Sequence, residues 1–280
     1  MRMRSSNPVL TRAFAPGGGQ APPQAPPGYA PAGYAPPGYG PPGQAPGSYV
    51  PPGYQTADRL TIDDVVIHTA GLLALVIGVA AITWVTVPME TSLALAMPAA
   101  FIALGIVLWT SFKRKGHVSP GLAIAYAVVE GVFVGAISHA FNDAFGGGIV
   151  MQAVVATAAV FAGMLGLYQA GVIRATPRMR KFLFVAGLGI MMTYLASFAM
   201  RAFGAEMPLL NDNSGLGILV SVAIIAVAAF FLILDFDQIE TAINVGAPRE
   251  FAWTAAFGLV VTIIWLYLEI LRLLSKLQSD

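Results

Sequence analysis

The chain contains no cysteine, three histidines and few charged residues. The absence of cysteine excludes disulfide frameworks, thiol catalysis and thiolate metal sites. Lys, Arg, Asp and Glu make up 10% of the 280 residues, against about 25% in a soluble globular protein. This composition argues against a soluble enzyme or a nucleic-acid-binding protein, because so few ionic groups do not coat a water-facing surface. The net charge of +1 also supplies no field that would attract a polyanion.

Hydrophobic residues make up 57% of the chain, and they are distributed unevenly. Residues 1–55 contain 14 of the 20 prolines, with Pro-Gly-Tyr units ending at Tyr29, Tyr39 and Tyr54. Such tracts bury too little apolar surface to offset the entropy lost on ordering. We therefore expect a disordered cytoplasmic tail over residues 1–55 and a membrane domain over residues 56–280. The tail is either a solvated segment or an arm that binds a partner.

Apolar runs fill the remainder of the chain. A transmembrane helix needs about 20 largely apolar residues, and seven runs are long enough. The sequence therefore predicts an all-α membrane protein with seven transmembrane helices. The expected spans are about 65–87, 92–112, 120–141, 149–173, 182–203 and 216–240, and the seventh lies somewhere within 251–274.

The loops between these spans alternate in charge. Lys113, Arg114 and Lys115 follow the second span, and four basic residues lie within 174–181 after the fourth. The intervening loops are acidic or nearly uncharged. Because Lys and Arg concentrate on the cytoplasmic side, we expect these basic loops and the N-terminus to be cytoplasmic. Seven spans then place the C-terminus outside, although Arg272 and Lys276 near that end argue mildly against it.

A few ionisable residues lie inside the spans, where a charge costs at least about 2.5 kcal/mol. They are Glu130 in the third span, Asp235 and Asp237 in the sixth, and Glu269 in the seventh. His139, near the end of the third span, is expected to be interfacial. Asp237 reaches either the headgroup layer or a polar interior.

Asp235 and Glu269 form the main candidate site. Two carboxyl groups on neighbouring helices in a low dielectric do not both ionise cheaply, so they would share a proton. We find no Lys or Arg in the middle of these spans to neutralise them. One interpretation is a pH-gated cation path, with Glu130 and Asp237 as possible accessory groups. The other is a pair of structural acids that stay protonated and bond to backbone carbonyls.

Several motifs resemble the Bax-inhibitor/YccA-like family of membrane proteins. They are the sixth-span sequence Leu-Asp-Phe-Asp-Gln-Ile from Leu234 to Ile239, and Leu-Tyr-Leu-Glu from Leu266 to Glu269. The stretch from Tyr126 to Gly135 and the segment from Ser6 to Leu10 are similar to bacterial members. The resemblance implies a seven-helix fold with the last helix in the centre, in a bacterial inner membrane.

The resemblance further implies a pH-sensitive calcium leak gated by two carboxyl groups. Carried over by motif, the gating and transient calcium-binding residues are Asp235 and Glu269, with Glu in place of the family's usual Asp. Calcium would be the transported ion, with no resident cofactor. Each helical residue rises about 1.5 Å, so the two side chains come level only if the turn is centred near Ala252. We therefore predict that residues 245–255 form a loop or short interfacial helix and that the last span starts near Thr254.

Two other function classes stay open. Some relatives bind a membrane protease, so a regulatory interaction protein with the tail as docking arm is the alternative to a channel. Ion flux by protein without the tail distinguishes these two, because a channel needs the spans alone. A membrane enzyme is disfavoured, since the sequence contains no zinc-protease, phosphate-binding or nucleophile-elbow motif.

The predicted topology is testable because the chain has no cysteine of its own. Single cysteines at Ser119 and Thr176 are expected to react with thiol reagents only after the membrane is made permeable, since both residues flank basic loops. A membrane-impermeant maleimide on intact cells provides the measurement. Labelling of either position in intact cells would contradict the topology.

Overall fold

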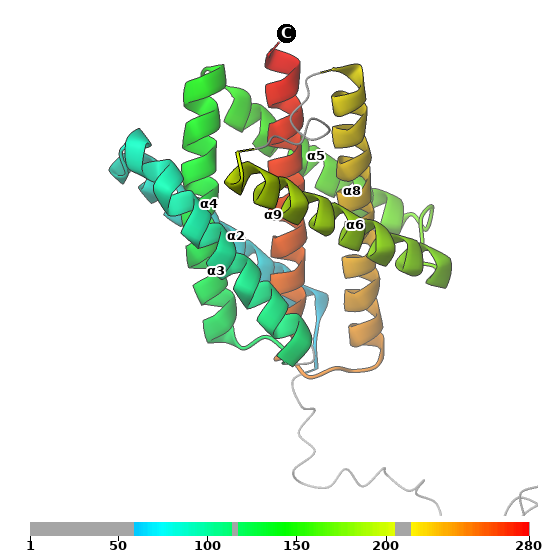
Figure 1. Ribbon diagram of the computed structural model, residues 1–280. Helices are drawn as coiled ribbons and strands as arrows, with labels where there is room; N and C mark the ends of the chain where they lie inside the picture. Colours follow the sequence, from blue (N-terminus) through cyan, green and yellow to red (C-terminus); the bar gives the residue numbers. More distant parts are fainter. Residues whose placement is uncertain (1–58, 114–116, 205–213, 280) are drawn as a thin grey trace, which may run out of the picture. The chain divides into compact units, whose positions relative to one another are not determined.

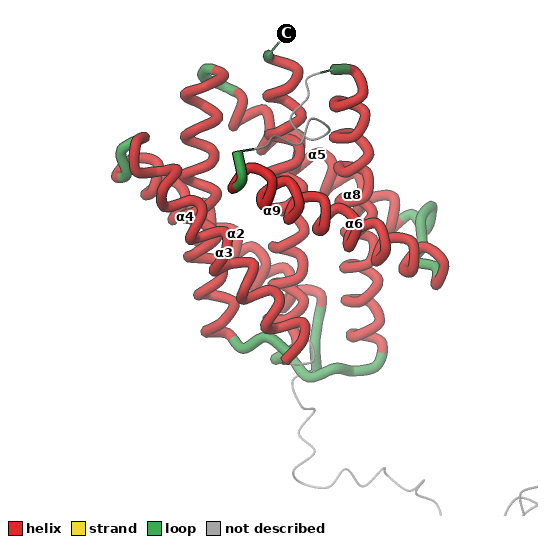
Figure 2. The backbone as a smooth tube through the Cα atoms, in the orientation of Figure 1, coloured by secondary structure: helices red, strands yellow, loops and turns green. Residues whose placement is uncertain are grey.

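A computed structural model of the protein describes residues 59–113, 117–204 and 214–279. Within these residues the chain forms helices joined by short loops (Figures 1 and 2). Seven helices are long and apolar enough to cross a membrane, which confirms the predicted fold class. The predicted tail over residues 1–55 and the basic residues Arg114 and Lys115 lie outside the described residues. The helices are α2 (Ile62–Thr86), α3 (Met89–Lys113), α4 (Pro120–Phe145), α5 (Ile149–Gln169), α6 (Pro177–Ala202), α8 (Gly215–Asn244) and α9 (Phe251–Gln278).

Three helix starts follow from local sequence signals. Thr61 caps α2 in a capping box with Asp64, in which each side chain accepts from the other residue's backbone N–H. Ser119 and Pro120 start α4 as expected. The predicted start of α6 near residue 182 is wrong, because Thr176 caps the helix and Pro177 occupies its first turn. The basic residues expected in a loop therefore belong largely to the first turns of α6.

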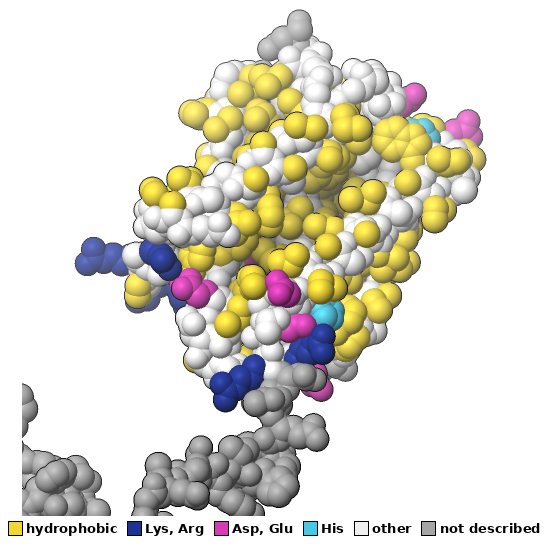
Figure 3. Space-filling model, turned by 180° about the vertical axis from the view of Figure 1, so that it is seen from behind, with side chains coloured by type: hydrophobic (Ala, Val, Ile, Leu, Met, Phe, Trp, Pro, Cys, Tyr) yellow, Lys and Arg dark blue, Asp and Glu magenta, His cyan; other side chains and the backbone are white. Residues whose placement is uncertain are grey.

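The last helix, α9, lies in the centre, as predicted. It packs broadly against α2, α4, α5 and α8, and Figure 1 shows it between α4 and α8. Hydrophobic side chains cover much of the face seen in Figure 3, while basic side chains gather toward its lower end. This distribution is expected of a bundle whose sides face lipid rather than water.

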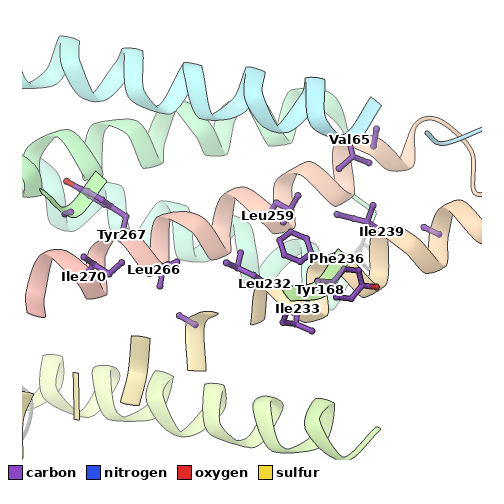
Figure 4. Packing of buried hydrophobic residues seen from close by; sticks show 14 of the residues in the cluster. Val65, Tyr168, Leu232, Ile233, Phe236, Ile239, Leu259, Leu266, Tyr267 and Ile270 are labelled. Atoms are coloured by element: carbon purple, nitrogen blue, oxygen red, sulfur yellow. The ribbon is translucent and has the colours of Figure 1, made fainter. Parts of the chain in front are cut away.

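Side chains from α8 and α9 form the middle of the core (Figure 4). Leu232 and Phe236 of α8 and Leu259 and Leu266 of α9 are buried in one cluster. Tyr168 of α5 packs against Phe236, with ring centroids 5.7 Å apart. These contacts fix α8 alongside α9 and so determine which polar side chains of the two helices meet.

Glycine allows α2 and α4 to approach closely. A Cβ atom at Gly135 would lie 2.5 Å from the Ala80 carbonyl oxygen and 2.8 Å from its Cα. A Cβ at Gly131 would lie 2.9 Å from the Val76 carbonyl oxygen. Small residues at helix contacts are the usual basis of close packing in membranes, where apolar burial from water supplies no driving force.

The connection between α8 and α9 is shorter than predicted. It runs from Val245 to Glu250, and α9 starts at Phe251 rather than near Thr254. Gly246 adopts a φ of 67° in this turn, a value that glycine adopts without steric cost. The chain preceding α2 holds the turn in place, because the Leu60 N–H donates to the Ala247 carbonyl at 2.9 Å.

The substitution Gly135→Ala is expected to destabilise the bundle by about 1–3 kcal/mol, because the added methyl group meets backbone atoms that have no room to move. The midpoint of thermal unfolding in detergent measures the effect. Gly163→Ala in α5 is the matched control, since nothing lies within 4 Å of a Cβ atom there. Equal midpoints for the two variants would contradict the close α2–α4 contact.

Candidate functional site

One side of α9 carries a line of polar side chains through the membrane-spanning region. Thr262, Trp265, Glu269, Arg272 and Lys276 follow one another at alternating spacings of three and four residues, which places them on one helix face. We call these five residues the polar stripe. At about 1.5 Å per residue the stripe extends about 21 Å, a large part of a hydrocarbon core about 30 Å thick.

Glu269 is the best-connected member of the polar stripe. Its side chain is 2% exposed. Its Oε1 accepts from the Tyr194 hydroxyl of α6 at 2.6 Å and from the Trp265 indole N–H at 3.1 Å. Its Oε2 lies 3.4 Å from the Arg272 guanidinium. Burial of this carboxylate is tolerable because three donors surround it, one of which, Arg272, is positively charged.

Arg272 completes a closed group with Glu269 and Tyr194. Its Nη1 donates to the Tyr194 hydroxyl at 2.5 Å, and its guanidinium carbon lies 4.7 Å from the centroid of the Tyr194 ring. The expectation that no basic residue would neutralise the acids is therefore wrong for Glu269. α9 continues to Gln278, so Arg272 lies well inside the helix rather than at its end.

Asp235 of α8 contacts the polar stripe at Thr262, at a different depth along α9 from Glu269. Its Oδ2 accepts from the Thr262 hydroxyl at 2.7 Å, and its Oδ1 lies beside Gly258, 3.8 Å from where a Cβ atom would be. Thr262 and Glu269 are seven residues apart, or about 10 Å along α9. The structure thus does not bring Asp235 and Glu269 together, because the tight turn at 245–250 leaves them at different depths. Among the described residues, the hydrogen-bond partners of the two acids differ.

Lys276 anchors the C-terminal end of the polar stripe. This side chain is 4% exposed. Its ammonium group donates to the Gly217 carbonyl at 3.0 Å and to the Ser221 hydroxyl at 2.9 Å, both in the first turns of α8. Polar contacts between α9 and its neighbours therefore extend from Asp235 to the far end of the bundle.

The other end of α8, toward the α8–α9 turn, carries ion pairs with the α5–α6 connection and with the first turn of α6. Asp237 pairs with Arg180 of α6. Glu240 pairs with Arg174 at 3.2 Å and accepts from the Tyr168 hydroxyl. Asp237 thus has a basic partner at the rim of the bundle, two residues from Asp235 but engaged in a separate contact.

Glu130 and His139 lie on α4, away from the polar stripe. Glu130 is 7% exposed and lies one helical turn from Tyr126, whose ring packs against Phe257 of α9. No hydrogen bond or ion pair of the described residues joins Glu130 to Asp235, Asp237 or Glu269. His139 stacks on Trp84 of α2, with centroids 5.3 Å apart, and within the described part of the chain its Nδ1 is buried without a hydrogen-bond partner.

Arg272, Lys276 and Tyr194 were not predicted as site residues, although the sequence contained a signal for the first two. Arg272 and Lys276 continue the three-and-four spacing from Thr262 and Glu269, so the periodicity of α9 places all of them on one face. Tyr194 carried no comparable signal, because its role depends on how α6 crosses α9. No group of three or more His, Asp or Glu side chains with metal-site spacing occurs in the described ranges.

These features define a multi-pass helical membrane protein whose apolar helices contact the lipid bilayer. A family model described as Bax inhibitor 1 like matches residues 7–279, and the chain belongs to this family. The comparison with curated protein sequences gave no significant match.

The group of Tyr194, Glu269 and Arg272 should contribute measurably to stability. Tyr194→Phe is expected to cost about 1–3 kcal/mol, because it leaves buried charged groups without a hydroxyl partner. Thermal unfolding in detergent measures the loss. Tyr126→Phe is the matched control, since Tyr126 is a buried tyrosine whose hydroxyl forms no hydrogen bond with a described residue. A Tyr194 variant as stable as the control would show that α6 is not held by this group.

Proposed function

We propose that this chain is a pH-sensitive cation leak, with calcium as the transported ion, and that it acts in transport rather than catalysis. The path follows the polar stripe between α9, α8 and α6. The observation that carries this proposal is the row of three polar contact groups along one face of α9: Thr262 with Asp235, Glu269 with Arg272, and Lys276 with Ser221. Polar and ionisable residues at membrane depth are costly and commonly mark ion pathways.

In this proposal Asp235 is the group that attracts the cation. Its contact in the described structure is a neutral hydroxyl, that of Thr262. At this depth the Asp235 carboxyl group therefore either carries a proton and is neutral, or is ionised and pairs with a cation. When pH rises and the proton leaves, a cation takes its place, so flux increases with pH. Ca²⁺ takes six to eight oxygen ligands, and water with backbone carbonyls would supply those that Asp235 and Thr262 do not.

The second element of the proposal is a closed gate at Glu269. The ion pair with Arg272 and the Tyr194 hydrogen bonds occupy the path beyond Asp235. A cation passes only when the guanidinium moves aside, because a fixed positive charge in a low dielectric repels it. The two acids thus act in sequence along the path, rather than by sharing one proton.

Asp235→Asn is expected to lower calcium flux at least about tenfold, equivalent to about 1.4 kcal/mol in the barrier, and to remove its pH dependence. Proteoliposomes that contain a calcium-sensitive dye provide the measurement over a series of pH values. Asp237→Asn is the matched control, because it neutralises an acid two residues away that is paired with Arg180. A pH response that survives in Asp235→Asn would exclude Asp235 as the titrating group.

The separation of the two acids gives a second expectation for the same assay. Changes more than about 7–10 Å apart with no shared partner usually add in free energy. The effects of Asp235→Asn and Glu269→Gln on the logarithm of flux should therefore be additive in the double variant. A double variant no worse than either single one would instead support a shared proton between the two carboxyls.

A further inference from the structure

An apolar groove opens on the side of the bundle where α2 and α5 diverge. Its volume is about 870 Å³, and it extends from Ile62 and Gln169 near the α8–α9 turn to Trp84 near the opposite end. Leu259 and Tyr267 of α9 contribute to its floor. Figure 3 shows this face hollowed between bands of hydrophobic side chains. The groove is separate from the polar stripe, which faces α8 and α6.

The hydroxyl groups inside the groove are engaged within the protein, while Gln169 lies exposed at its end. Thr69 and Thr157 donate to carbonyls of their own helices, and the hydroxyls of Ser138 and Tyr267 bond to each other at 2.7 Å. A polar ligand would therefore find few partners there. An apolar cavity of this kind does not retain water, so hydrocarbon is the occupant that fits its walls.

Basic side chains border the mouth of the groove near the α8–α9 turn. The Arg59 guanidinium lies close to Gly246, in the extended segment three residues before Ile62 of the groove wall. Arg174, on the α5 side, stacks on Tyr168 and pairs with Glu240. Arg249 pairs with Asp64, whereas Arg59 forms no ion pair with a described residue. Asp63, beside Ile62, is also exposed at this mouth, so a phosphate group would meet the single Arg59 guanidinium rather than a broad basic surface.

We propose that the groove binds one anionic phospholipid of the leaflet on the side of the α8–α9 turn. Its acyl chains lie between α2 and α5, and its phosphate contacts Arg59. The apolar walls at membrane depth select a lipid over a soluble phosphate compound, and the guanidinium selects an anionic headgroup over a zwitterionic one. This site is independent of the proposed ion path, so it stands whether or not the protein conducts cations.

Native mass spectrometry of the full chain, released from detergent with added phosphatidylglycerol, tests the proposal. The wild type is expected to retain one lipid. Ala158→Phe places a ring in the groove and should reduce retention roughly tenfold, since it displaces at least about two methylene groups. Ala159→Phe is the matched control, because Ala159 is the next residue of α5 and does not line the groove. Ala81→Phe fills the groove from α2 if Ala158→Phe does not fold.

The headgroup is tested separately. Arg59→Gln should weaken phosphatidylglycerol retention about fivefold, from about 1 kcal/mol per basic side chain, and leave phosphatidylcholine retention unchanged. Arg178→Gln should alter neither. Glycerol phosphate without acyl chains should not bind.

Three results would overturn the proposal. One is equal lipid retention by the Ala158 and Ala159 variants. Another is equal retention of the two lipids by the wild type. The third is a change in the dimer fraction of Ala158→Phe without lipid, which would show that a second copy of the chain occupies the groove.

Discussion

A charged side chain inside a membrane must find its partners within the protein, and α9 carries three charged side chains in its C-terminal half. Glu269, Arg272 and Lys276 would each cost several kcal/mol if left without partners. The positions of α6 and the start of α8 answer this constraint, because Tyr194 bonds to both Glu269 and Arg272 while Gly217 and Ser221 accept from Lys276. The polar stripe thus organises this half of the bundle.

The position of α6 depends on these polar contacts more than the positions of the other helices do. Most of its side chains face outward, and it contacts α8 at Gly187, where a Cβ atom would lie 2.9 Å from the ring of Phe231. Phe231 in turn contacts Trp265, with centroids 5.6 Å apart. A helix with so few buried apolar contacts gains its orientation from directional bonds, since those bonds fix both position and angle. The other half of the bundle is arranged differently, through the close α2–α4 contact at Gly131 and Gly135.

The sequence predicted the helices well because each span is set by local properties. Apolar length identified all seven, Thr61 marked the start of α2 through its side-chain cap, and Pro120 marked the start of α4 at the first helical position. The start of α6 was misplaced because its basic residues were interpreted as a loop, although Thr176 and Pro177 carried a capping signal. The distance between Asp235 and Glu269 was harder to predict, because it depends on the length of the turn between α8 and α9. A turn a few residues longer would bring the acids level, and composition alone does not determine that length.

The residue at position 269 illustrates how the network constrains the sequence. The family resemblance leads one to expect Asp there, and the chain has Glu. The longer side chain brings its carboxylate to Tyr194, Trp265 and Arg272 at 2.6, 3.1 and 3.4 Å. An Asp side chain ends one carbon–carbon bond earlier, about 1.5 Å, which exceeds the tolerance of these hydrogen bonds. A Glu that binds its own helix and α6 has no need of a carboxyl partner on α8. The position of Asp235 beside Thr262 and the presence of Glu at 269 are therefore two consequences of one arrangement, in which each acid has its own partners.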